Sequence, residues 1–343
     1  MSGITKIEWC DISWNPVVGC TPASEGCRNC YAKALHDMRH KAYLEGKKLP
    51  RQYAEPFEKI QLLEDRITQP FSWKKPARVF VNSMSDLFHP DVPDDFIYKV
   101  LTTAMCAERH TFIILTKRAR RMFQFYLKHQ FAVWVNAPNI WHVVSIENQN
   151  AANERLGYFL QVPSVVHGVS AEPLLGDLDL RNVRPVEGYE SRRIDALQGV
   201  TCYDNGGAYQ DQQKINWVIC GGESGPNARP MHPDWARSLR DQCQAAAIPF
   251  FFKQWGEWKP ISETNEEECD QYYYPLPENF HGFGTRKCRY ENSPIRFDGG
   301  EDWYSIDGHP SYLTFRVGKK RAGRLLDGVE WNAFPVDLTP TLP

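Results

Sequence analysis

The stretch HTFIILTKR, residues 110–118, places a short apolar run directly before polar and basic residues. Five further stretches share this arrangement: ARVFVNSMSD (77–86), IWHVVSIEN (140–148), SVVHGVSAEP (164–173), INWVICGGESG (215–225) and IPFFFKQWG (248–256). Near-continuous apolar strands of this kind are typical of a parallel sheet that is buried on both faces. With DISWNPVVG (11–19) as a first strand, the sequence offers seven units of strand and helix.

The segments between these strands suit helices. PDDFIYKVLTTAMCAE (93–108) opens with a proline and two acids, and HPDWARSLRDQCQAAA (232–247) repeats the pattern; both space apolar residues three or four positions apart. Alternating strands and helices predict an α/β fold, a partial or complete (βα) TIM-like barrel. Since barrels commonly reach this length, we predict a single domain over residues 1–343. Three polar stretches look inserted into it, near residues 36–76, 182–214 and 259–312.

Composition narrows the class of protein. Hydrophobic residues make up 42% of the 343 residues, enough for a large packed core and outside the range of disordered chains. The net charge of -2, from 40 basic and 42 acidic side chains, excludes a global field that would attract nucleic acid, so any such binding must rest on local patches. No apolar run approaches the ~18 residues of a membrane span, and we expect a cytoplasmic protein without membrane contact.

Three cysteines gather in VGCTPASEGCRNCYA (18–32), at positions 20, 27 and 30. Ten irregularly spaced cysteines in a chain of this size indicate a reducing compartment, so clustered thiols favour ligands over disulfides. Structural zinc requires four ligands, and Cys10 or His36 would have to complete the set. Cys10 lies in the first strand region, and we expect a helix to begin at His36. An iron–sulfur cluster held by three thiols keeps one iron open for a substrate or cofactor. Buried structural thiols are the third interpretation.

Nine stretches carry a resemblance to a known family: TKIEWCDISWNPVVGC (5–20), GCRNCYA (26–32), VFVNSMSDLFHPDVP (79–93), LTKRARR (115–121), VSIENQ (144–149), VSAEPLLG (169–176), WVICGGESGPNARPMHPDW (217–235), FFFKQWGEW (250–258) and GKKRAGRLLDGVEWNAFP (318–335). The chain resembles a family of phage-borne and prophage-borne three-cysteine proteins that looks like an outlying branch of the radical S-adenosylmethionine superfamily. The nearest relative we suggest is spore photoproduct lyase, which also has a tyrosine after its third cysteine. The chain departs from the superfamily pattern in its six-residue first gap and in Asn29, which stands where an aromatic residue is usual.

The resemblance implies a cofactor and a reaction. Cys20, Cys27 and Cys30 would hold a [4Fe–4S] cluster whose open iron binds S-adenosylmethionine, and an external donor would supply the electron for its cleavage to a 5′-deoxyadenosyl radical. The fold would be a radical-enzyme barrel, and the protein would work in the host cytoplasm if it is phage-encoded. Phage carriage favours a nucleobase in DNA as the substrate, for modification or repair.

Polar residues at the predicted strand ends are candidates for contact with the cofactor. They are Asn82, Ser83, Ser85 and Asp86 after the second strand, Ser145, Glu147 and Asn148 after the fourth, Gly221, Gly222 and Glu223 after the sixth, and Tyr31 beside the third cysteine. Glycines let a backbone approach a ligand closely, although Gly-Gly also serves ordinary turns. A polar turn in which Asp86 caps a helix is the alternative for the first group.

Candidate catalytic residues are Glu172, Lys253 and Cys220. Glu172 would accept hydrogen bonds from substrate or pair with Lys117 or Arg118; Cys220 would return a hydrogen atom or serve as a core thiol.

A basic cluster opens a predicted helix, where cations and free N–H groups make a phosphate site: Lys117, Arg118, Arg120 and Arg121. A solvated face is the alternative. Trp73, Trp255 and Trp258 are candidate stacking surfaces for a nucleic acid.

Two other functions stay open. One is a zinc-stabilised module that binds nucleic acid or protein without redox chemistry. The other is a radical enzyme that acts on a peptide or a small metabolite.

Overall fold

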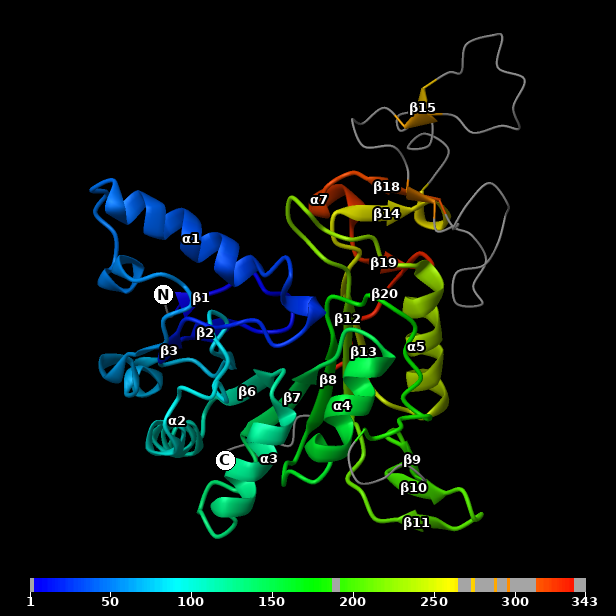
Figure 1. Ribbon diagram of the computed structural model, residues 1–343, viewed down its shortest axis with the longest axis horizontal. Helices are drawn as coiled ribbons and strands as arrows, with labels where there is room; N and C mark the ends of the chain where they lie inside the picture. The colour runs from blue at the N-terminus through cyan, green and yellow to red at the C-terminus, as the bar shows by residue number, and fades with distance from the viewer. Residues whose placement is uncertain are drawn as a thin grey trace.

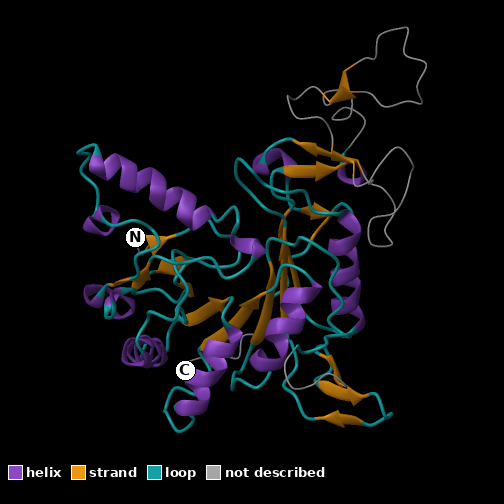
Figure 2. Cartoon of the chain, in the orientation of Figure 1, coloured by secondary structure: helices purple, strands orange, loops and turns teal. Residues whose placement is uncertain are grey.

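The computed structural model describes residues 3–186, 192–264 and 313–335, together with three short strand segments at 273–274, 287–288 and 295–296. Figure 1 traces the chain and Figure 2 separates its helices from its strands.

One sheet organises the described part of the chain, with eight strands in the order β1-β2-β5-β6-β7-β8-β12-β13. Their bounds are β1 (Gly3–Ile4), β2 (Ile12–Trp14), β5 (Arg78–Val81), β6 (Thr111–Thr116), β7 (Ile140–Ser145), β8 (His167–Ala171), β12 (Trp217–Gly221) and β13 (Phe250–Gln254). Each neighbouring pair from β2 to β13 is parallel, and β1 runs antiparallel to β2. All seven predicted strands are therefore confirmed.

The strand order from β2 to β13 follows the chain without reversal, and no described strand joins β13 back to β1. Four helices lie in the described crossovers that follow β5: α2 (Asp94–Cys106), α3 (Ala119–Lys128), α4 (Gln149–Phe159) and α5 (Pro233–Ala245). Their buried residues share one apolar cluster with every second strand residue, such as Val79, Ile114 and Val218. The helices thus cover one face of the sheet, which we call the outer face (Figure 1).

The opposite, inner face carries its own apolar cluster. It contains Trp9, Cys10, Phe80, Ile113, Trp141, Val143, Val166, Trp217, Ile219 and Phe251. Several rings meet edge to face there, with the Trp141 and Trp217 centroids 6.0 Å apart. The cluster is filled from strands and from the segments that precede β2 and follow β20, because Trp9 and Phe334 both pack in it.

A segment near residue 332 lies along the free edge of β13. The Phe252 N–H donates to Trp331 O at 2.9 Å, and the Ala333 N–H donates to Phe250 O at 3.2 Å. Together with β1 at the other end, this segment gives both outer strands of the parallel sheet a neighbour.

The predicted insertions form small elements of their own. The first, residues 36–76, holds most of α1 (Tyr31–Leu44), β4 (Gln61–Leu62), and the short 3-10 turns η2 (Arg51–Ala54), η3 (Glu64–Arg66) and η4 (Gln69–Ser72). Just before it lie β3 (Val17–Val18), which pairs with β4, and the 3-10 turn η1 (Glu25–Cys27). The second forms a sheet of β9 (Arg192–Asp195), β10 (Val200–Tyr203) and β11 (Ala208–Gln210). Most of the third lies outside the described residues. What is described around it is β14 (Trp258–Pro260), η5 (Ile261–Glu263), β15 (Tyr273–Tyr274), β16 (Lys287–Cys288), β17 (Ile295–Arg296), β18 (Leu313–Arg316), α7 (Lys319–Ala322), β19 (Leu325–Leu326) and β20 (Val329–Glu330).

Both helices predicted from apolar spacing are confirmed as α2 and α5, and each buries the predicted face. The helix after the cysteines begins at Tyr31 rather than near His36, because Cys30 stands at its N-cap. Within the described residues, no helix is both long and apolar enough to cross a membrane.

Candidate functional site

The side chains of the inner face change from aromatic to polar toward the carboxyl ends of its strands. Beyond the aromatic cluster, inward positions hold hydroxyl and charged side chains. We call this set the polar layer; it comprises Ser13, Ser83, Lys117, Ser145, Ser170, Glu172 and Lys253. Since the carboxyl ends of parallel strands meet at one rim, groups far apart in sequence lie together there.

On the side of β8 and β13, Glu172 and Lys253 form an ion pair. Lys253 Nζ lies 2.9 Å from Glu172 Oε1, and the Ser170 hydroxyl donates to Glu172 Oε2 at 3.2 Å. Burial pulls the pKa of Lys253 down, but the adjacent carboxylate outweighs it and holds the pKa above its ordinary value. A Cβ added at Gly221 would lie 2.8 Å from Glu172 Oε1, so the glycine leaves room for this pair.

In the middle of the rim, Glu147 sits between two cations. Arg155 Nη1 on α4 lies 2.9 Å from Glu147 Oε2, and Lys117 Nζ lies 3.3 Å from the same oxygen. Burial alone would raise the pKa of Glu147, but Lys117 and Arg155 outweigh it and lower the pKa to about 2. Lys117 also donates to Ser145 Oγ at 2.7 Å, which ties two strands together.

The cysteine loop follows β3 at the same rim. Gly19 has φ +99°, and a Cβ there would lie 2.3 Å from Lys59 O, so only glycine fits where the loop starts. Cys20 and Cys30 both pack against a small apolar cluster that contains Phe57 and Met84. The Tyr31 hydroxyl donates to Ser83 O at 2.7 Å and links the loop to the polar layer.

The donor set of this loop fits a thiolate-bound metal group. Burial raises the pKa of Cys20 to about 11 and that of Cys30 above its ordinary value, and a negative charge at the neighbouring Cys27 adds to both shifts. Cys20 and Cys30 share one apolar cluster, and the Cys30 N–H donates to Cys27 O at 3.3 Å, although among residues 3–186, 192–264 and 313–335 no three His, Cys, Asp or Glu side chains converge as a metal site. The buried amide nitrogen of Asn82, close to the loop, has no hydrogen-bond partner in this described part.

Neither predicted fourth ligand completes a metal site with these thiols in the described residues. Cys10 packs in the aromatic cluster of the inner face. His36 is fully buried, with Nε2 2.9 Å from Glu55 O and the ring against Phe57. Three thiols that no fourth ligand joins within the described residues suit a cluster with an open iron better than a closed zinc site.

Comparison with known protein families matches residues 4–335 to the family described as Protein of unknown function (DUF5131). The chain belongs to the DUF5131 family. No curated protein and no solved structure matches it. The matched range spans the cysteine loop and the whole polar layer of this DUF5131 chain.

The predicted basic cluster is divided among different surroundings. Lys117 and Arg118 point into the rim and pair with Glu147 and Asp86. Arg121 pairs with Asp94 on α2, and Arg120 lies over the Tyr158 ring on α4, 5.8 Å from its centroid. The four residues do not form one phosphate site in this structure.

Other predicted site residues have structural roles. Cys220 is fully buried in the outer-face cluster, away from the polar layer, which makes it the core thiol that was the alternative. Asn148 caps α4 by accepting from Ala151 N at 3.0 Å, and the Ser85 hydroxyl donates to Val17 O at 2.9 Å. A Cβ on Gly222 would lie 2.1 Å from Trp255 O, so this glycine serves the contact between two loops.

The predicted stacking tryptophans are not open surfaces. Trp255 and Trp258 are buried, and their indole N–H groups donate to Leu325 O and Ala228 O, each at 2.7 Å. Trp73 is partly buried against the outer-face core.

Four residues of the rim were missed by the sequence analysis. Arg155 clamps Glu147, and Asn15 accepts from Met84 N at 2.9 Å. Asn29 donates to Glu223 Oε2 at 2.9 Å, and Arg229 contacts both Glu223 and Glu25. Burial would raise the pKa of Glu223, but its hydrogen bonds with Arg229 and Asn29 lower it. The one available signal was the polarity of SWN (13–15), which ends a buried strand.

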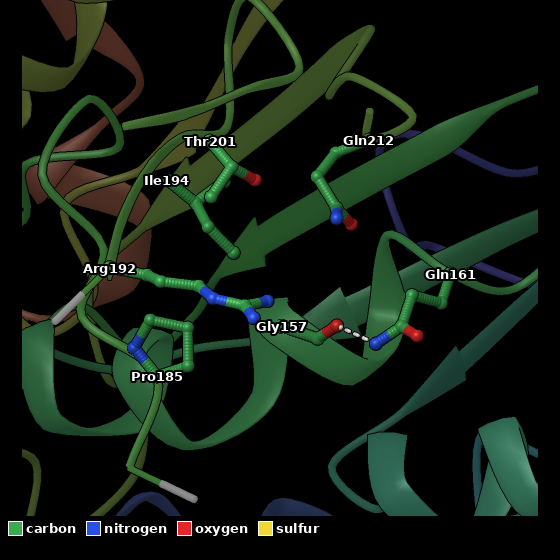
Figure 3. A pocket seen from close by; sticks show the side chains of 7 residues that line it. All are labelled: Gly157, Gln161, Pro185, Arg192, Ile194, Thr201 and Gln212. Atoms are coloured by element: carbon green, nitrogen blue, oxygen red, sulfur yellow. Dashed lines mark hydrogen bonds between the residues drawn. The ribbon is translucent and has the colours of Figure 1, made fainter. Parts of the chain in front are cut away.

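A small surface pocket lies elsewhere, beside α4 and the β9–β10 hairpin (Figure 3). Its lining consists of Gly157, Gln161, Pro185, Arg192, Ile194, Thr201 and Gln212. The lining offers neither a thiol nor a carboxylate.

Proposed function

We propose that this protein is a radical S-adenosylmethionine enzyme: Cys20, Cys27 and Cys30 hold a [4Fe–4S] cluster, and the polar layer receives the cofactor and substrate. The observation that carries the proposal is the cysteine loop itself, three neighbouring thiols at the rim where the inner face turns polar. The sequence resemblance to the radical superfamily supports the same assignment.

We propose further that the sheet is a partial (βα) barrel. Seven parallel strands in chain order with helices on one face are what a singly wound barrel requires, whereas a doubly wound sheet reverses its order and carries helices on both faces.

Bound at the three thiols, the cluster would supply one-electron cleavage of S-adenosylmethionine. The chain supplies the surroundings. The aromatic cluster closes the floor of the inner face to water, and the Glu172–Lys253 pair offers a carboxylate and an ammonium group to a polar ligand. Glu147 is held ionised by Lys117 and Arg155, so it can accept hydrogen bonds from a cofactor.

The setting of the proposed reaction is a reducing cytoplasm with an external electron donor. The eight cysteines within residues 3–186, 192–264 and 313–335 are free of disulfides. A DNA nucleobase as substrate rested on the family resemblance and its phage carriage. The basic cluster and the tryptophans made nucleic acid a candidate, and their positions add no support for it. The proposal is therefore limited to cleavage of the cofactor.

The test is anaerobic reconstitution of the full chain with iron and sulfide, followed by dithionite reduction with S-adenosylmethionine. We expect about four iron ions per chain and formation of 5′-deoxyadenosine. Cys27→Ala should abolish the product. Cys106→Ala, an exposed thiol at the end of α2, is the matched control and should retain it.

A colourless protein with about one zinc ion, no sulfide and no 5′-deoxyadenosine would overturn the proposal and support the zinc-stabilised binding module. Product that forms equally in Cys27→Ala would also overturn it.

A further inference from the structure

Resting on the proposed function, we propose that Arg118 is a positioning residue that raises the reduction potential of the cluster through Cys20. The sequence analysis assigned this arginine to substrate phosphate. Its contacts give it another partner.

Arg118 reaches the cysteine loop with both ends of its guanidinium group. Nη1 lies 3.8 Å from Cys20 Sγ, within range of an N–H to sulfur hydrogen bond, and Nη2 donates to Thr21 O at 2.8 Å.

The guanidinium is held in place by a buried carboxylate. Arg118 Nη1 lies 3.0 Å from Asp86 Oδ2, and the two side chains are only 12% and 8% exposed. Asp86 is fixed in turn by the Thr116 hydroxyl at 2.8 Å and by the Lys117 N–H at 3.1 Å. The Arg118–Asp86 ion pair, which we call the bracket, therefore joins the ends of β5 and β6 to the first cysteine.

This arrangement also argues against a phosphate role. A phosphate bound by Arg118 would have to displace Asp86 and break the bond to Thr21 O, leaving a buried carboxylate without its cation. Rigid pairing suits a residue that acts on a fixed neighbour rather than on an incoming ligand.

The physical effect follows from charge. A cluster gains negative charge when it is reduced, and a cation or N–H donor at a ligand sulfur stabilises that form. The carboxylate of Asp86 has the opposite charge and opposes the effect. Removal of one member of the pair should shift the potential in the opposite direction from removal of the other.

The experiment is a redox titration of the reconstituted protein, followed by electron paramagnetic resonance, for a double-mutant cycle. We expect Arg118→Gln to lower the equilibrium constant for one-electron reduction about tenfold, a fall of about 59 mV. Asp86→Asn should raise the potential, and the double variant should fall between the two single variants. Arg118→Lys should recover part of the loss because it keeps the charge.

The matched control is Arg120→Gln, on the same helix and over the Tyr158 ring, which should leave the potential unchanged. In the metal-free protein, hydrogen exchange of the loop 20–30 should rise in Arg118→Gln, less in Arg118→Lys, and stay unchanged in Arg120→Gln.

The outcomes separate the two proposals. A wild-type protein that assembles no cluster overturns the proposed function, and this inference with it. A wild-type cluster with equal potentials in all variants overturns the inference alone. Shifts of the same sign in both single variants would assign the bracket a purely structural role.

Discussion

The two halves of the inner face differ although the same strands build both. In β7 the inward residues pass from Trp141 through Val143 to Ser145, and in β13 Phe251 is followed two positions later by Lys253. The amino-terminal half is an aromatic cluster, whereas the carboxyl-terminal half is the polar layer with its ion pairs.

The difference teaches how one sheet separates stability from chemistry. Side chains alternate between the two faces of a sheet along each strand. Two residues that lie two positions apart therefore point to the same face and differ only in their position along the strand. We call the amino-terminal half, with the aromatic cluster, the lower half, and the carboxyl-terminal half, with the polar layer, the upper half. We expect substitutions in the lower half to affect mainly the free energy of unfolding. Changes in the upper half should affect mainly the contacts made to a ligand.

The largest effect should come from Trp217→Ala in the lower half. Trp217 is fully buried, and its indole N–H donates to Ala333 O at 3.1 Å. We expect the free energy of unfolding in urea to fall by about 4 kcal/mol, through lost contacts and the cavity that remains. Tyr209→Ala, at a ring that is 61% exposed, is the control and should change it by less than about 0.5 kcal/mol. Equal losses of unfolding free energy in Trp217→Ala and Tyr209→Ala would contradict the conclusion that the lower half provides stability.

A smaller effect should appear with pH through Glu147. Because its pKa is lowered to about 2 in the folded protein, its ionised form stabilises the fold above the ordinary value of 4.5, and this contribution is lost as pH falls from there toward 2. We expect the wild type to lose about 2–3 kcal/mol of unfolding free energy over that range, from ~1.4 kcal/mol per pKa unit.

The matched variant is Glu147→Gln, which cannot ionise and should be less stable than the wild type at neutral pH. Its unfolding free energy should lack this part of the acid dependence. Parallel pH profiles for the two proteins would show that Glu147 is not the responsible group.

The smallest effect on stability should come from Gly221→Ala in the upper half. The new Cβ would lie 2.8 Å from Glu172 Oε1, at the movable end of a side chain, so the carboxylate should shift away from Lys253. We expect a loss below about 1 kcal/mol, together with faster acylation of Lys253 measured by mass spectrometry. Gly3→Ala, with nothing within 4 Å of its Cβ, is the control. A loss of several kcal/mol would mean that the upper half is packed core.

The fold was predictable because its signals are local. Each of the seven parallel strands is a short apolar run that ends in polar residues, and α2 carries two acids in its first turn and its apolar face within thirteen residues. The start of α1 was missed because Cys30 is an unusual N-cap and the helix bears few apolar residues.

The site was predictable only in part because pairing is not local. Lys117 and Arg120 look alike in sequence, yet one enters the rim and the other lies over Tyr158, which depends on helix rotation. Cys220 differs from its inward neighbours only in strand parity. Arg155 lies eight residues after Glu147, and only the packing of α4 on β7 brings them together.

The short segments that flank the sheet have a consequence for aggregation and synthesis. An outer strand with unpaired backbone N–H and C=O groups can pair with a strand of another chain and so start aggregation. Here β1 covers the edge of β2, and residues 331–333 cover the edge of β13 through backbone hydrogen bonds. The second covering segment lies almost at the far end of the matched range, more than 75 residues after the strand that it covers. A nascent chain therefore carries an exposed β13 on the ribosome until residue 333 has emerged, and that interval is when we expect it to depend most on chaperones.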